Sequence, residues 1–353
     1  MAYDIYYPMT EFSLPEWPYA YGGPSGAGDI KIEPEDFVVE EILSFEPEGS
    51  GEHIFLHIEK IGENTEYVAR QLARHAGVRQ RDVSYAGLKD RHGRTRQWFS
   101  VWLPGKEDPE WSAIESDQLR ILQTIRHARK LKRGVLAGNR FTLLIRNWTG
   151  DRELAEKQLQ QIKTQGFPNY FGPQRFGHHG QNIDRALAIF AGAKVKREQR
   201  SLYLSAARSY LFNLILAQRV AQASWHRSLN GDVFKLEGSN SCFTGDSNDA
   251  SLSARVQQGD IHPTGIMWGR GGKIATAEAG AIEDAVIAAN ASIADGLLAF
   301  DLEADRRALR TLPQEMAWQW LDNQVNLSFC LPAGSYATAL LREIIGDAPS
   351  AAY

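Results

Sequence analysis

The chain has 353 residues, of which 43% are hydrophobic and 23% are charged, and its formal net charge is −4. This length is enough for two domains with a sizeable core, and the composition excludes a disordered or fibrous protein. The nearly balanced charge also excludes a uniformly basic nucleic-acid-binding protein.

The two cysteines, Cys242 and Cys330, lie far apart and in no metal-like spacing. This pattern argues against a structural zinc site or a disulfide framework and favours a reducing compartment. Residues 1–28 lack the basic head and apolar run of a signal peptide. No apolar stretch approaches the roughly 20 residues that span a bilayer. We therefore expect a cytoplasmic protein that contacts no membrane and binds no metal.

The first 165 residues have the pattern of strands joined by short turns. Residues 1–28 have no regular period, and their aromatic side chains are expected to pack on the body as an extended arm. The alternation at residues 53–60 is typical of a half-buried strand. Short turns between strands favour an antiparallel α+β sheet over a doubly wound parallel one. Strands are predicted at residues 30–32, 37–42, 53–60, 83–88, 98–103, 119–124 and 141–145, and helices at residues 64–76 and 151–163.

The sequence changes character near residue 166. Residues 167–177 are aromatic and rich in turn formers, as a crossover between domains would be, and mainly helical patterns follow. A closing strand and helix resemble the first half, so we expect the second domain to be inserted into the first. Helices are predicted at residues 181–191, 205–223, 281–298, 303–309 and 336–345, irregular segments at 238–249 and 260–272, and a strand at 321–331.

Charge is distributed unevenly along the chain. Residues 118–150 contain eight Lys and Arg and no Asp or Glu, and residues 126–133 are the densest part of this basic run. Residues 230–305 contain twelve acidic residues against four basic ones. The asymmetry indicates a local anion-binding face on a protein that is not basic as a whole.

One carboxylate, Asp90, lies in a predicted hairpin turn that is rich in basic residues. Nearby cations lower the pKa of a carboxyl group, so Asp90 is expected to stay ionised and to act as a nucleophile or to stabilise a cation. The alternation of a strand at residues 83–88, continued to Asp90, places the carboxylate at the end of a buried face. A solvated hairpin tip with one salt bridge would have the same pattern. The basic residues are Arg81, Lys89, Arg91, Arg94 and Arg96.

The turn that contains Asp90 resembles the signature of the tRNA pseudouridine synthase D (TruD) family. The signature covers residues 87–92, Gly-Leu-Lys-Asp-Arg-His, with Thr95 and Gln97 behind them. Further blocks of residues that resemble the family occur along the chain, in the family's order and with family-like spacing. These blocks are residues 34–39, 138–143, 169–177, 205–209 and 331–338, with Arg342 and Glu343.

The resemblance implies an isomerase that converts a uridine of tRNA to pseudouridine, at position 13 in bacterial members. It implies a catalytic domain of the pseudouridine-synthase type, an antiparallel sheet with flanking helices. It also implies an inserted α/β domain, and the two form an RNA-binding cleft. By this analogy residues 1–28 are an N-terminal extension, residues 29–164 and 314–353 form the catalytic domain, and residues 165–313 are the inserted domain.

The resemblance also assigns roles to single residues. The family's nucleophilic aspartate matches Asp90. Its substrate-pocket residues match Phe37, Asn139 and Tyr336, the last at a position that is usually phenylalanine. An aromatic ring can stack on a flipped base, and an Asn amide can hold a uracil edge. Without the resemblance, Phe37 would be read as a core residue, Asn139 as a turn residue and Tyr336 as the start of a helix.

Three further positions belong to the expected site. Lys31 matches the family lysine that precedes the Phe37 block, and with Lys89 it is expected to bind substrate and keep the Asp90 carboxylate charged. Gly93 stands where the family often has alanine, which is expected to loosen the turn.

The implied reaction requires no redox step, phosphoryl donor or metal, so no cofactor is expected, and tRNA is the expected partner of a monomer. Two other functions fit parts of the sequence. A non-catalytic RNA-binding or RNA-chaperone protein would use the same basic and aromatic residues. A glycoside hydrolase would need a second carboxyl group about 5–9 Å from the first, and Glu35 and Asp36 are the candidates.

Overall fold

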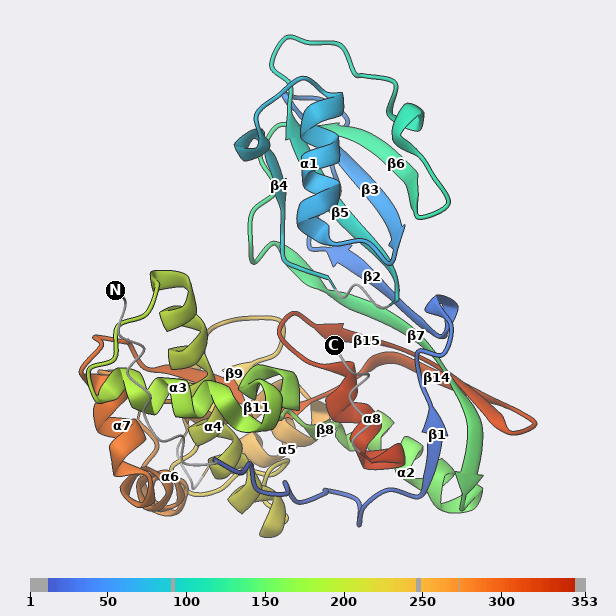
Figure 1. The fold of residues 1–353 in the computed structure, drawn as a ribbon. Helices are drawn as coiled ribbons and strands as arrows, with labels where there is room; N and C mark the ends of the chain where they lie inside the picture. The colour runs from blue at the N-terminus through green and yellow to red at the C-terminus, as the bar shows by residue number, and fades with distance from the viewer. Residues whose placement is uncertain (1–11, 90–92, 246–248, 273, 347–353) are drawn as a thin grey trace. The chain divides into compact units, whose positions relative to one another are not determined.

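Figure 1 shows the chain as a computed structural model. The structure describes residues 12–89, 93–245, 249–272 and 274–346. Within these ranges, no helix combines the length and the apolar character that crossing a membrane requires.

The described residues fall into two compact units. The sheet unit comprises residues 26–152 and 313–337, and the helical unit comprises residues 12–25, 153–312 and 338–346. Parts of the predicted catalytic domain, including residues 153–164, thus group with the helical unit. The division of the chain into a catalytic and an inserted domain stays a prediction.

A large mixed sheet dominates the sheet unit. Among the described residues its nine strands run in the order β14-β15-β7-β2-β5-β3-β6, with β1 paired to β7 and β4 paired to β5. The β2–β5 pair is parallel, and the other pairs are antiparallel. The α+β class with an antiparallel-rich sheet is therefore confirmed. The strands are β1 (Gly26–Asp29), β2 (Phe37–Leu43), β3 (His53–Ile61), β4 (Val83–Tyr85), β5 (Arg94–Trp102), β6 (Leu119–His127), β7 (Leu136–Gly150), β14 (Gln314–Leu321) and β15 (Gln324–Pro332).

Strand β3 is buried on both faces, so the prediction of a half-buried strand was wrong. Ile54, Leu56 and Ile58 pack against the apolar stripe of helix α1 (Thr65–His75). On the opposite face, Phe55 packs with Trp98, whose ring is also stacked on His57 at 4.6 Å between centroids. Side chains from other segments cover both faces of the strand, which explains why even its polar positions lose contact with water.

Two strand boundaries near the expected site differ from the prediction. Strand β4 ends at Tyr85, and residues 86 and 87 form a bend, so strand alternation does not extend from residue 83 to Asp90. Strand β5 begins at Arg94 instead of at residue 98. The predicted strand at residues 30–32 is also absent, and β1 lies just before it. Lys31 has a φ of +61°, which a strand does not accommodate.

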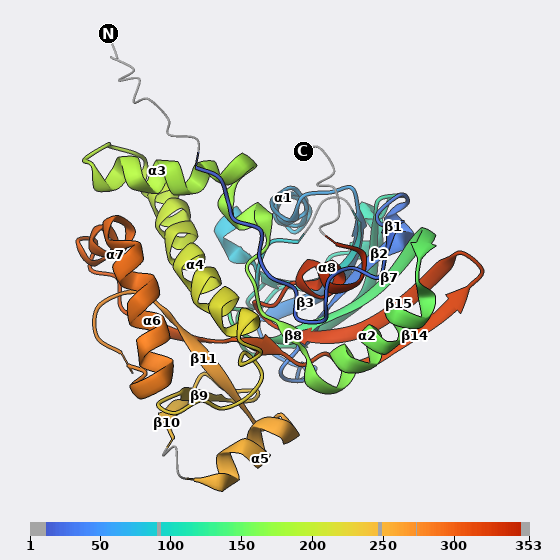
Figure 2. The same ribbon diagram turned by 90° about the horizontal axis from the view of Figure 1, so that it is seen from below.

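The helical unit is built around the long helix α4, which packs against α3, α6, α7 and strand β11 (Figure 2). A four-stranded sheet has the order β10-β9-β11-β12, and β8 pairs with β13. The helices are α2 (Arg152–Gln165), α3 (Gln181–Phe190), α4 (Arg197–Ala221), α5 (Ala250–Gln258), α6 (Ala277–Ala289), α7 (Ala291–Leu298) and α8 (Ala337–Ile345). The strands are β8 (Phe167–Pro168), β9 (Val233–Leu236), β10 (Cys242–Thr244), β11 (Ile261–Met267), β12 (Asp305–Ala308) and β13 (Arg310–Thr311).

Two predictions for this unit were wrong because tertiary packing overrides local signals. The segment read as irregular, residues 260–272, contains β11, and the predicted helix at residues 303–309 contains β12. The two strands pair in antiparallel register. Gly265 permits close packing of β11, because a Cβ there would lie 3.1 Å from the ring of Phe212 on α4. The predicted helix at 281–298 is two helices, separated at Asn290.

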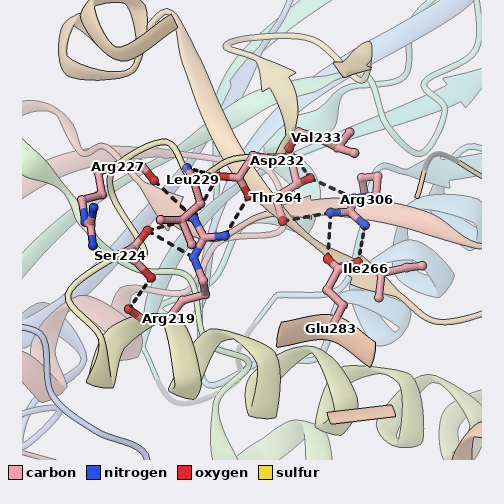
Figure 3. Close-up of polar contacts among 10 residues, drawn as sticks. All are labelled: Arg219, Ser224, Arg227, Leu229, Asp232, Val233, Thr264, Ile266, Glu283 and Arg306. Atoms are coloured by element: carbon pink, nitrogen blue, oxygen red, sulfur yellow. Dashed lines mark hydrogen bonds and ion pairs between the residues drawn. The ribbon is translucent and has the colours of Figure 1, made fainter. Parts of the chain in front are cut away.

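Two buried ion pairs hold this unit together (Figure 3). Arg219 donates to both carboxylate oxygens of Asp232 at 2.7 and 3.0 Å, and their side chains are 2% and 0% exposed. Arg306 donates to both oxygens of Glu283 at 2.8 and 2.9 Å. Backbone groups complete both sites, because Leu229 N donates to Asp232 and Arg306 donates to the carbonyl of Thr264.

Residues 12–25, the described part of the N-terminal arm before β1, group with the helical unit, and their aromatic side chains pack on it as predicted. Trp17 stacks on Tyr170 with ring centroids 5.8 Å apart, and the Arg342 guanidinium lies 4.1 Å from the Tyr19 ring. The amide of Ala20 donates to Glu343 at 2.8 Å. The arm also forms one wall of a pocket of about 500 Å³, whose other walls come from residues 170–173 and α8.

Candidate active site

Phe37, the first residue of β2, is positioned by the carboxylate that precedes it. Asp36 is fully buried and accepts three hydrogen bonds of 2.7–3.0 Å from Arg146 on β7, and a fourth from the amide of Glu33 at 2.9 Å. Burial, the largest single influence, would raise the pKa of Asp36, but the bonds and charge of Arg146 together with hydrogen bonds from backbone amides outweigh it and hold the pKa below its usual range. The pair fixes the entry into β2.

We expect Asp36→Asn to destabilise the protein by about 1–3 kcal/mol at pH 7, because the charge-assisted bonds to Arg146 are lost. A carboxyl group whose pKa is lowered by folding contributes stability above its unfolded pKa of about 3.9, and this contribution disappears as the pH falls through the lower folded pKa. The difference in the free energy of unfolding between variant and wild type, measured by urea denaturation, should therefore shrink below pH 4. A difference that stayed constant down to pH 2 would contradict this assignment.

Lys31 and Phe37 are brought together. The Lys31 ammonium lies 4.2 Å from the centroid of the Phe37 ring, in cation–π contact. The left-handed backbone of Lys31 is costly for a residue other than glycine, and such strain is found most often at functional sites. Phe37 is 6% exposed and packs edge-to-face on Phe141. The ring therefore has a core role, and base stacking on it stays a prediction.

Gly93 lies directly against the start of β2. A Cβ at this position would be 2.7 Å from the carbonyl oxygen of Phe37. An alanine could be accommodated only if the two backbones moved apart. The glycine thus permits close approach here.

Lys89 and Asn139 are also brought together, and with them a residue that the sequence analysis missed. Lys89 Nζ donates to Asn139 Oδ1 at 2.7 Å and forms an ion pair with Glu41 Oε1 at 3.0 Å. Glu41 and Asn139 are cross-strand neighbours in the β2–β7 register. A signal was present, because Glu41 continues the buried face begun by Phe37 and Val39, where a charged residue needs a partner.

Burial raises the pKa of the Glu41 carboxyl, and the Lys89 ammonium acts in the opposite direction. The other carboxylate oxygen, Oε2, accepts the amide of Trp98 at 2.8 Å. Directly opposed residues point to the same face of an antiparallel pair, so Phe37, Glu41 and Asn139 share one face of the sheet.

The backbone that leads to residue 90 is held by two buried polar side chains. Gln97 Nε2 donates to the carbonyl of Gly87 at 2.6 Å, and the amide of Lys89 donates to Thr65 Oγ1 at 3.1 Å. Thr65 Oγ1 in turn donates to Gln97 Oε1 at 3.0 Å. Asp90 itself, with residues 91 and 92, lies outside the described residues.

The predicted view of one carboxylate among basic residues was wrong, because neighbouring strands bring further carboxylates. Arg94 pairs with Glu35 and with Glu59 Oε1 at 2.7 Å, and Arg96 pairs with Glu59 Oε2 at 3.0 Å. Lys89 pairs with Glu41 as described above. Three of the five bases near Asp90 thus carry carboxylate partners that are distant in sequence.

Tyr336 is partly exposed and immediately precedes helix α8. Strand β15, five residues earlier, pairs Leu331 with Asn139. Asn139 therefore lies close to the start of the turn at residues 332–335, in which Ser335 N donates to the carbonyl of Pro332. The placement of Tyr336 in the uracil pocket stays a prediction.

In the described part of the chain, no group of three or more His, Cys, Asp or Glu side chains is arranged to hold a metal ion. The residues brought together are an ammonium, an amide and a buried carboxylate. Their chemistry is hydrogen bonding and charge stabilisation.

Comparison with known proteins decides the family. The family model described as tRNA pseudouridine synthase D (TruD) matches residues 17–185 and 178–344. The chain belongs to the TruD family. The expected class of enzyme, an isomerase, is thereby confirmed.

Individual relatives match over almost the full chain. A tRNA pseudouridine synthase D from Methylococcus capsulatus is 50% identical over 331 residues, which cover 93% of this chain and 94% of that protein. One from Aeromonas salmonicida is 48% identical over 334 residues and covers 94% of each chain. A crystal structure named as TruD from Methanosarcina mazei matches with a TM-score of 0.73 and 22% identity, over 93% of this chain and 95% of that one. The structural match supports the fold.

Proposed function

We propose that this protein isomerises a uridine of tRNA, at position 13, to pseudouridine, with Asp90 as the nucleophile. The observation that supports the proposal is the contact between Lys89, the residue before position 90, and Asn139, which shares a sheet face with Phe37, in a chain of the TruD family. The proposal includes tRNA as the partner, a monomer and a cytoplasmic location. It also includes residues 165–313 as the inserted domain of the family.

The reaction breaks the N1–C1′ bond of the nucleotide and forms a C5–C1′ bond, while the C5 proton is lost and N1 gains one. No co-reactant is consumed, since the product has the mass of the substrate. An ionised Asp90 attacks C1′ or the base, or initiates elimination at C2′. The flipped base stacks on Phe37 or Tyr336, with about 1–3 kcal/mol per base, which offsets the cost of extrusion.

The two candidate acids of a glycoside hydrolase are poorly suited to that role. The hydrogen bond from Arg94 lowers the pKa of Glu35, and Arg146 together with backbone amides keeps the pKa of Asp36 low against the effect of burial. A general acid must carry a proton near neutral pH. Both groups are ionised there, which favours the isomerase.

The proposal is tested by mapping pseudouridine in RNA from cells with and without the gene. We expect one uridine of tRNA to be unmodified when the gene is absent and restored when the gene is returned. An unchanged map, with RNA binding retained by the purified protein, would favour the non-catalytic RNA-binding alternative.

The exposed part of the basic run is expected to contact phosphates. Lys130 Nζ donates to the carbonyl of Arg81 at 3.3 Å, so the turn that follows β6 lies beside residues 79–82. The turn that follows β6 carries four exposed basic residues, Arg129, Lys130, Lys132 and Arg133, which we name the basic turn.

Replacing Lys132 and Arg133 by alanine should weaken tRNA binding and flatten its salt dependence. Each lost phosphate contact lowers the slope of log K against log salt by about 0.7–0.9, and the double variant removes up to two. Filter binding between 50 and 300 mM salt measures the slope. Lys157→Ala, an exposed lysine of α2, is the matched control and should leave the slope unchanged. An unchanged slope in the double variant would exclude these residues from the RNA interface.

A further inference from the structure

The chemistry of Lys89 fixes which end of the Asn139 amide faces it. A lysine ammonium donates hydrogen bonds and accepts none, so the Asn139 atom that lies 2.7 Å from Lys89 Nζ must be the oxygen. The amide NH₂ group therefore points away from Lys89. If the Asn139 amide were rotated by half a turn, its NH₂ group would face the Lys89 ammonium. Two hydrogen-bond donors would then meet, which is strongly unfavourable.

Lys89 is itself held in place by a buried group. Glu41 lies 3.0 Å from Lys89 Nζ, and the two side chains are 0% and 11% exposed. Glu41 cannot turn away, because its second oxygen accepts the Trp98 amide at 2.8 Å on the neighbouring strand. The backbone of Lys89 is fixed as well, by Thr65. Both ends of the lysine are thus constrained.

We propose that Glu41 and Lys89 are positioning residues that hold Asn139 as a hydrogen-bond donor toward a carbonyl oxygen of the flipped uracil. The inference rests on the proposed function and adds how the base is recognised. The N–H groups of the Asn139 amide can donate hydrogen bonds to O2 or O4 of uracil. Cytosine carries an amino group in place of O4, so a donor aimed at that position selects against it.

The first test is Asn139→Asp in the full-length protein. Aspartate keeps an oxygen toward Lys89 with nearly the same shape but has no NH₂ group. We expect kcat/KM for tRNA to fall about 10- to 100-fold, the cost of one hydrogen bond to the base, and to fall as far as in Asn139→Ala. If Asn139 instead accepts the uracil N3–H through its oxygen, Asn139→Asp will retain wild-type activity, and the inference is overturned.

The second test uses modified RNA, and each protein, wild type or variant, is compared with itself on unmodified and modified tRNA. Sulfur is a weaker acceptor than oxygen, so tRNA with 2-thiouridine or 4-thiouridine at the target position reports which atom is recognised. We expect one of the two to lower kcat/KM about 10-fold in wild type, and this penalty to vanish in Asn139→Ala. If neither substitution has an effect that depends on Asn139, the donor role is excluded.

The positioning role of Glu41 has a matched control on the same strand. Glu41→Gln keeps an acceptor for the Trp98 amide but removes the charge that holds Lys89. The loss of kcat/KM that the thiouridine causes, which we call the thio penalty, should shrink in Glu41→Gln and in Lys89→Met. It should be retained in Lys89→Arg. Glu40→Gln, whose side chain faces the other side and lies 3.5 Å from Arg96, should retain it too. A merely structural Glu41 would change stability and leave the thio penalty intact.

Failure of this inference is distinguishable from failure of the proposed function. If wild type forms no pseudouridine in any tRNA, the proposed function is wrong. If wild type is active and Asn139→Asp is equally active, the donor role of Asn139 alone is wrong.

Discussion

Asp90→Asn is expected to lower the rate of pseudouridine formation by at least about 10⁴-fold, a loss typical of removing an enzymatic nucleophile. The neutral amide has nearly the shape of the carboxylate but cannot attack the nucleotide. The groups that would hold the base, among them Asn139 and Phe37, are unaffected. Binding of tRNA should therefore stay within a few-fold of wild type. Single-turnover conversion of labelled tRNA and filter binding measure the two quantities.

Asp117→Asn is the matched control, because Asp117 is an exposed carboxylate of the same unit. It should leave both conversion and binding unchanged. Conversion by Asp90→Asn at the wild-type rate would falsify the assignment of the nucleophile. Loss of both binding and conversion, with the fold intact, would instead give Asp90 a role in holding the RNA.

The second large effect is on stability. Asp232→Ala should destabilise the helical unit by about 3–5 kcal/mol, because it leaves the buried guanidinium of Arg219 without its counter-charge. Arg219 is 2% exposed and donates to both oxygens of Asp232, and the other carboxylate in Figure 3, Glu283, is bound to Arg306. Urea denaturation followed by tryptophan fluorescence measures the loss.

Two further variants separate charge burial from simple loss of a contact. Asp260→Ala removes the partner of Arg255 in a largely exposed pair and should cost about 0–1 kcal/mol. The double variant Arg219→Met with Asp232→Leu should recover most of the stability, because no unpaired charge stays buried. A double variant as unstable as Asp232→Ala would show that the carboxylate acts chiefly by accepting the amide of Leu229.

The expected site could be predicted residue by residue but not as a constellation. Phe37 and Asn139 were identified from motifs, and the structure shows that the strands carrying them are neighbours in one sheet. Glu41 was missed, since its relation to Lys89 depends on how β2 pairs with β7. Strand pairing is set by contacts between distant segments, and the residue types of one segment do not specify its partner.

The fold errors have the same origin. Residues 303–309 have a helix-like composition, yet Arg306 is buried against Glu283 and its segment pairs with β11. The energy of such long-range pairing exceeds the weak local preference for a helix. The half-buried pattern of β3 was misleading for a related reason, because apolar side chains from neighbouring strands and loops cover the face that was expected to be exposed.

The sequence by itself determined the family, the α+β class and the residue types that the chemistry requires, because these depend on composition, local periodicity and short motifs. Only the tertiary structure decided that Lys89 is shared between Glu41 and Asn139 and that most of the basic residues near position 90 have carboxylate partners. The reason is physical: the charge environment and hydrogen-bond geometry of a group depend on neighbours within a few ångströms, and these come from strands far apart in the chain.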